Sequence, residues 1–214
     1  MNGVSPDGKR VSYSGASRET KMDIYTLPLD LSDPEHPKAG KPEVYLATPA
    51  REWLGRFSPD GRWMGYLSDE SGTQELYVRP FPGPGGKWQI SNGGANIPVW
   101  SRDGQQIFYT NPEKKIMVSD YTAKGDSFSY SKPRVLTDTV LNHTEFDIAP
   151  DGTRFAVVSR PDAVQAKQGN LHAMFLLNFA DEVRRKSPLN GNWSAVSWAS
   201  LLSYPVGSVC RPYP

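Results

Sequence analysis

A fourfold repeat of an Asp-Gly dipeptide constrains the fold of this chain more than any other feature. The copies are Asp7-Gly8, Asp60-Gly61, Asp103-Gly104 and Asp151-Gly152, and they follow one another after 53, 43 and 48 residues. An apolar residue stands three positions before each Asp, and another stands four positions after it. A period of this length is typical of repeat architectures, in which each copy is one supersecondary unit.

The residues around each Asp-Gly pair predict strands. β-branched and aromatic side chains alternate on both sides of the pair, as in half-buried strands. Glycine adopts a positive φ at little cost and aspartate bonds to the turn backbone, so Asp-Gly between strands predicts a tight hairpin turn. The most regular copy contains four predicted strands, at Trp53–Ser58, Arg62–Ser68, Gln74–Arg79 and Lys87–Ser91.

The other copies follow the same plan. We expect strands at Gly3–Ser5, Arg10–Ser14, Met22–Leu27 and Glu43–Ala47, at Ile97–Ser101, Gln105–Thr110, Lys115–Ser119 and Arg134–Thr137, and at Thr144–Ala149, Thr153–Ser159 and Ala173–Phe179. Four-stranded antiparallel units that repeat every ~40–50 residues are typical of β-propeller blades. The sequence therefore predicts an all-β propeller with about four blades, the first incomplete. We expect a part of a larger, six-bladed propeller, with a four-bladed ring as the alternative.

Composition changes near the C-terminus. Residues 1–188 contain the predicted blades, and Asp181–Lys186 is the best candidate for a short helix. Residues 189–214 are rich in Ser, Trp and Pro, contain Arg211 as their single charged residue, and contain no copy of the repeat. We predict that this segment is an atypical, poorly ordered tail.

Charge and cysteine content exclude several protein classes. The formal net charge is +1, which gives no general attraction to nucleic acid. A single cysteine, Cys210, cannot form an intrachain disulfide. The chain has no apolar run long enough for a transmembrane helix, and its first residues do not have the pattern of a signal peptide.

With the four turns aligned, the chain resembles the TolB-type, WD-like (PD40-type) propeller repeat over about residues 4–188. The stretch Glu75–Ser91, followed by Pro98–Gly104, is similar to the propeller that follows the kinase domain in bacterial serine/threonine protein kinases. Arg102 and Ala149 depart from the Ser-Pro-Asp-Gly pattern. In a membrane-anchored kinase the resemblance would imply an extracytoplasmic location. The Gly-rich loop, His-Arg-Asp and Asp-Phe-Gly motifs of a kinase are absent, so kinase activity is not carried over.

The sequence contains no recognisable catalytic or metal centre. Calcium needs several oxygen ligands that converge on one ion, whereas the turn aspartates are predicted on separate blades. His36, His143 and His172 lack the spacing of metal ligands. The Gly-x-Ser-x-Gly elbow of hydrolases is also absent. We therefore predict a non-enzymatic chain without a cofactor or metal.

A binding function is expected on the loops, because the strands of a propeller are occupied by packing. The loops between consecutive blades are predicted at residues 48–52, 92–96 and 138–145, on the same face as the loops between second and third strands. The polar candidates there are Arg51, Glu52, Asn96, His143 and Glu145.

Three hypotheses about function follow. The first is a non-catalytic binding or sensor module that binds a peptide, a protein or a small ligand on this face. The second is a propeller that gates substrate access in a peptidase-type hydrolase. The third is a stand-alone propeller enzyme, which would need convergent acid, base or metal residues. Exposed strand edges would also allow self-association.

Overall fold

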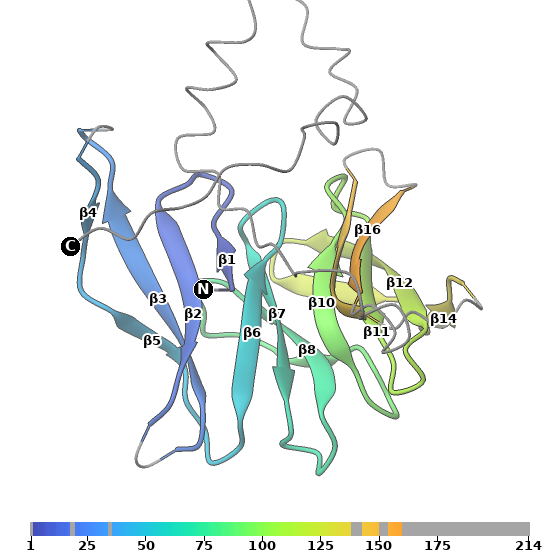
Figure 1. The fold of residues 1–214 in the computed structure, drawn as a ribbon. Helices are drawn as coiled ribbons and strands as arrows, with labels where there is room; N and C mark the ends of the chain where they lie inside the picture. The colour runs from blue at the N-terminus through green and yellow to red at the C-terminus, as the bar shows by residue number, and fades with distance from the viewer. Residues whose placement is uncertain (1, 18–19, 34–35, 138–142, 150–153, 160–214) are drawn as a thin grey trace, which may run out of the picture. The chain divides into compact units, whose positions relative to one another are not determined.

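The computed structural model describes residues 2–17, 20–33, 36–137, 143–149 and 154–159. The chain divides into two compact units, Met1–Val164 and Gln165–Pro214, and all of the described residues belong to the first unit. Every regular element among them is a β-strand (Figure 1). The predicted strand at Ala173–Phe179, the predicted helix and the predicted tail lie outside the described residues.

The strands form four sheets in chain order, and all pairs of neighbouring strands are antiparallel. We call the sheets the first to fourth blades. Their strands are β1 (Gly3–Val4), β2 (Arg10–Gly15), β3 (Asp23–Asp30), β4 (Lys38–Ala39) and β5 (Glu43–Leu46); β6 (Glu52–Phe57), β7 (Trp63–Ser68), β8 (Glu75–Pro80) and β9 (Trp88–Gln89); β10 (Asn96–Trp100), β11 (Gln106–Thr110), β12 (Ile116–Lys124), β13 (Ser127–Tyr130) and β14 (Arg134–Val135); β15 (His143–Ile148) and β16 (Phe155–Ser159). The predicted all-β architecture of four-stranded blades is confirmed.

Two blades carry an extra hairpin strand. The third strand of each is long and pairs with two partners in succession: β3 pairs with β5 and then with β4, and β12 pairs with β14 and then with β13. The prediction of a strand at Lys115–Ser119 was therefore too short, and it missed β13. The extra strands extend the blade on the side of the Asp-Gly turns, because β3 and β12 run toward that end.

The Asp-Gly turns are held by their own side chains. In the second blade, Ser58 Oγ donates to Asp60 Oδ1 at 2.5 Å, and the Arg62 amide donates to the same oxygen at 3.1 Å. The first blade repeats both bonds from Ser5 and Lys9 to Asp7, at 2.6 and 3.1 Å. The glycines have φ of 72° at Gly8, 71° at Gly61 and 69° at Gly104, where a side chain would be strained.

The third turn is less regular, as expected where Arg102 replaces proline. The Gln105 amide still donates to Asp103 Oδ1 at 3.1 Å, but Ser101 Oγ donates to the Gln106 carbonyl instead of to Asp103. The fourth turn, Asp151-Gly152, lies outside the described residues.

The core lies between successive blades. Ile24 and Leu46 of the first blade pack with four residues of the second, Phe57, Met64, Tyr66 and Tyr77. Between the second and third blades the core is aromatic: Trp63 is 1% exposed and Trp100 is 7% exposed. A Cβ at Gly65 would lie 3.1 Å from the Trp100 ring, so this glycine lets the indole lie against the sheet.

Candidate functional site

The first strands of the second, third and fourth blades begin at one common end. Glu52, Asn96 and His143 are the first residues of β6, β10 and β15. Contacts join β6 to β10 and β10 to β15, and the ends of β6 and β10 meet where Trp100 Nε1 donates to the Arg56 carbonyl at 3.0 Å. The loops between consecutive blades therefore open at the opposite end from the Asp-Gly turns. We call this end the loop end.

The candidate residues lie at the loop end, but four of them lie in strands, and of these only Glu145 was also predicted in a strand. Glu52, Asn96, His143 and Glu145 belong to β6, β10 and β15, and Arg51 forms an isolated parallel bridge with Met22. The structure describes His143 and Glu145 through the backbone of β15.

A one-residue bulge interrupts each of these first strands. The register shifts between Trp53 and Arg56 in β6, between Asn96 and Val99 in β10, and between His143 and Glu145 in β15. Two bulge residues at equivalent positions, Leu54 and Ile97, have φ of 53° and 49°. This conformation is strained for a side chain that is not glycine, and most strained for β-branched isoleucine. Bulges of this kind are over-represented beside binding sites because they redirect a side chain.

Arg51 lies on a backbone that Asp69 holds, and its guanidinium lies over the Trp53 ring. Its amide donates to Asp69 Oδ1 at 2.8 Å, and its carbonyl accepts from the Asp69 amide at 3.3 Å. Its guanidinium carbon lies 5.0 Å from the centre of the Trp53 ring. Arg51 is exposed, and no described residue forms a hydrogen bond or ion pair with its guanidinium.

Glu52 is buried, although Arg51 next to it in sequence is exposed. The Glu52 side chain is 1% exposed. The Thr48 hydroxyl bonds to Oε1, and the Thr48 amide donates to Oε2 at 3.3 Å. Burial raises the pKa of Glu52 above its usual value, and the Thr48 bonds oppose that shift. The carboxylate therefore fixes the loop before β6 and is not presented to solvent.

Asn96 and Glu75 hold the next loop. Gln74 Nε2 donates to Asn96 Oδ1 and to the Ala95 carbonyl, each at 2.7 Å. Glu75, 2% exposed, accepts the amides of Gly93 and Gly94 at 2.8 and 2.9 Å through Oε1. The sequence prediction missed Glu75. The sequence does contain a signal for it. Glu75 is the first residue of the third strand of its blade, and an acidic residue, Asp23, stands at the same place in the first blade.

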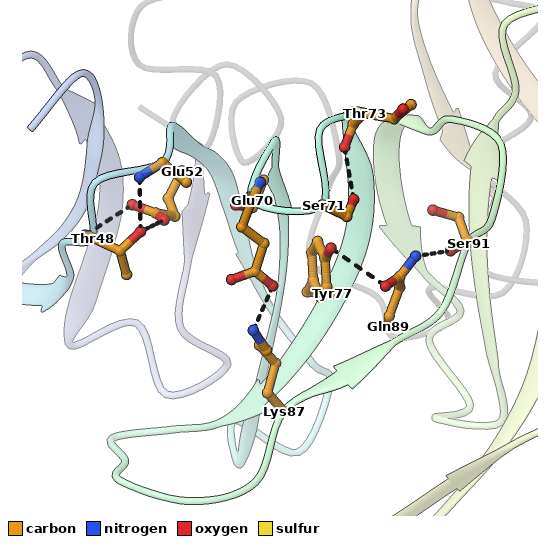
Figure 2. A network of polar contacts seen from close by, with 11 residues as sticks. Thr48, Glu52, Glu70, Ser71, Thr73, Tyr77, Lys87, Gln89 and Ser91 are labelled. Atoms are coloured by element: carbon orange, nitrogen blue, oxygen red, sulfur yellow. Dashed lines mark hydrogen bonds and ion pairs between the residues drawn. The ribbon is translucent and has the colours of Figure 1, made fainter.

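A shallow depression of about 370 Å³ lies on the second blade, lined by Glu70, Ser71, Tyr77, Lys87 and Gln89. Figure 2 shows Glu70 and Lys87 pointing toward each other, 2.5 Å apart between Oε1 and Nζ. Tyr77 OH donates to Gln89 Oε1 at 3.4 Å. The Lys87 ammonium also lies 5.4 Å from the centre of the Tyr77 ring. Because the two charged groups satisfy each other, the depression offers little to a ligand.

The described residues contain neither a cluster of metal ligands nor a membrane-spanning helix. No three His, Cys, Asp or Glu side chains among them lie close enough together to hold a metal ion. No helix among them is long and apolar enough to cross a membrane.

The sheet order, the Asp-Gly turns and the shared loop end together decide the fold. The sheets are the blades of a β-propeller. Among solved structures, the chain is similar to TolB from Acinetobacter baumannii at 21% identity. The match covers 75% of this chain and 37% of that chain, with a TM-score of 0.48. The chain is also similar to a protein described as TolB from Agrobacterium tumefaciens, with 21% identity, 63% of this chain, 49% of that chain and a TM-score of 0.45.

The chain is also similar to two proteins that are not described as TolB. A nidogen/laminin complex is matched with 19% identity over 66% of this chain and 49% of that chain, at a TM-score of 0.44. The uncharacterized peptidase YuxL of Bacillus subtilis is 29% identical over 109 residues, which are 50% of this chain and 16% of the peptidase. The chain thus spans about a sixth of that relative and less than half of each of these solved chains. No family model matches the sequence.

Proposed function

We propose that this chain is a non-catalytic binding module that holds a peptide or protein segment at the loop end of its blades. The observation that carries the proposal is the common start of β6, β10 and β15, with a bulge in each strand. The loops there are fixed by buried carboxylates, Glu52 and Glu75. A preformed surface of this kind binds at a lower entropic cost than mobile loops.

A panning experiment tests this proposal. A random-peptide phage library is selected on the purified full chain, and the selected peptides are titrated by fluorescence polarisation. The double variant Arg51→Ala/Asn96→Ala alters the loop end, and Arg102→Ala/Gln105→Ala makes matched changes at exposed residues of the Asp-Gly end. We expect the first variant to weaken binding at least about tenfold and the second to leave it unchanged. Peptides that respond only to the second variant would overturn the proposal.

For the parent protein, we infer a kinase-linked or TolB-like bacterial protein in which this module senses a ligand. The second candidate is a propeller that gates a peptidase-type hydrolase, and the identity with the Bacillus peptidase favours it. Two activity probes applied to the native protein distinguish the two candidates. An acyl-phosphate ATP probe would label a linked kinase, and a fluorophosphonate would label a linked serine hydrolase.

A further inference from the structure

We propose that Arg51, stacked on Trp53, is the anchor for a carboxylate of the bound peptide. This inference rests on the proposed function and specifies the ligand chemistry at the same surface. It follows from the geometry of the guanidinium, the fixed backbone beneath it and the absence of a partner among the described residues.

Backbone hydrogen bonds and the Trp53 ring limit the positions that the Arg51 guanidinium can take. The backbone of Arg51 is held by Asp69 through two hydrogen bonds, and the Glu52 amide donates to the Met22 carbonyl at 2.7 Å. The stacking on Trp53 at 5.0 Å restricts the side chain further. A planar guanidinium in a fixed position offers a fork of N–H donors that matches a carboxylate with two parallel bonds.

The nearby carboxylates do not neutralise Arg51. Glu52, its neighbour in sequence, is turned into the protein and bonded to Thr48. Asp69 bonds to the Arg51 amide and not to its guanidinium. These two acidic groups lower the local positive potential, which favours a singly charged carboxylate over a doubly charged phosphate.

The Trp53 ring provides the second part of the anchor. Trp53 is half-buried. Its position in β6 is equivalent to that of Asn96 in β10, because each is the last paired residue before the bulge: Trp53 pairs with Leu67, and Asn96 pairs with Thr110. The indole and the Asn96 amide therefore stand at corresponding places on contacting strands. The Trp53 ring beside the guanidinium gives an apolar surface for the peptide segment that carries the carboxylate, and Asn96 carries an amide at the equivalent place on the contacting strand.

The test uses dipeptide probes and NMR on the full chain. The probes are N-acetyl-Asp-Asp-amide, N-acetyl-Ala-Ala with a free C-terminal carboxylate, and N-acetyl-Asn-Asn-amide as the neutral isostere. We expect at least one carboxylate probe to give saturable shifts of the Arg51 Nε–H and Trp53 indole N–H resonances, and the isostere to give none. The two carboxylate probes distinguish an acidic side chain from a C-terminus as the source. Equal shifts with all three probes, or none, would overturn the inference.

Substitutions complete the test. Arg51→Gln should abolish the shifts at Trp53, Arg51→Lys should weaken them because the planar fork is lost, and Arg102→Gln should leave them unchanged. The fold should survive, since Arg51 is exposed. If Arg51→Gln leaves the shifts intact, the inference is wrong. If the panned peptides bind at the loop end regardless of Arg51, the inference fails while the proposed function stands.

Discussion

Two residues that are neighbours in sequence have opposite roles at the start of β6. Arg51 is exposed and stacked on Trp53, and Glu52 is 1% exposed and bonded to Thr48. From sequence, both were candidates for ligand contact, because both are polar and precede a predicted strand. Which of the two side chains points inward depends on how the loop packs, and a local pattern does not contain that information.

The buried carboxyl of Glu52 makes stability depend on pH. Burial raises its pKa in the folded state, so between the ordinary and the raised value the folded state binds more protons than the unfolded state. The free energy of unfolding therefore falls as pH rises through that window, and it stays lower at higher pH. The Glu52→Gln variant loses this contribution to the pH dependence of stability, because the Gln side chain does not titrate. Acidification from neutral pH should therefore raise the free energy of unfolding of the wild type relative to this variant.

Urea denaturation of both proteins at several pH values measures this difference. Glu113→Gln is the matched control, because the Glu113 side chain is 70% exposed and lies 3.5 Å from Lys115 Nζ. It should not reproduce the change seen with Glu52→Gln. Parallel pH profiles for the wild type and Glu52→Gln would show that burial of this carboxyl does not control stability.

At the scale of elements, the hairpin of β12 and β13 fastens the third blade to the second. Phe128 is 3% exposed and lies 5.1 Å from Trp63, 5.6 Å from Trp88 and 5.1 Å from Tyr121, measured between ring centres. Tyr130 OH also donates to the Gln89 carbonyl at 2.6 Å. The hairpin thus closes the aromatic core between the two blades.

Phe128→Ala should destabilise the protein by about 3–5 kcal/mol, because it removes a buried ring and leaves a cavity. Tyr130→Phe, which removes only the hydroxyl that bonds to Gln89, should cost about 0.5–1.5 kcal/mol. Chemical denaturation followed by tryptophan fluorescence measures both values. Equal effects of the two substitutions would mean that the ring of Phe128 does not carry the contact between the blades.

The sequence predicted the hairpins around the Asp-Gly turns because Asp and Gly determine the local geometry there. It did not predict β4 or β13, because both pair with the far part of a long third strand. Lys38–Ala39 is too short for an alternating pattern, and Ser127–Tyr130 follows Gly125-Asp126, which was assigned to a loop. The bulges at Leu54 and Ile97 were also missed, since aliphatic side chains give no local signal for a positive φ.

At the scale of the whole molecule, the blades repeat one tyrosine pair in different surroundings. Tyr13 and Tyr25 stack in the first blade at 5.4 Å, and Tyr66 and Tyr77 stack in the second at 5.8 Å. The second pair is buried against Ile24 and Leu46 of the preceding blade. The first pair is only half-buried, and Val44, paired with Tyr25, is 62% exposed.

We expect the purified chain to self-associate through this face of the first blade, because an exposed apolar sheet face can pack against a second copy of the chain. Val44→Lys places a charge there and should shift association to higher protein concentration. The matched control is Val135→Lys: Val135 is 45% exposed and, paired with Met117, has the position in the third blade that Val44 has in the first. Sedimentation velocity over a concentration series measures both variants. If Val135→Lys lowers association as much as Val44→Lys, or if the wild type stays monomeric throughout, the face of the first blade does not bind a second copy.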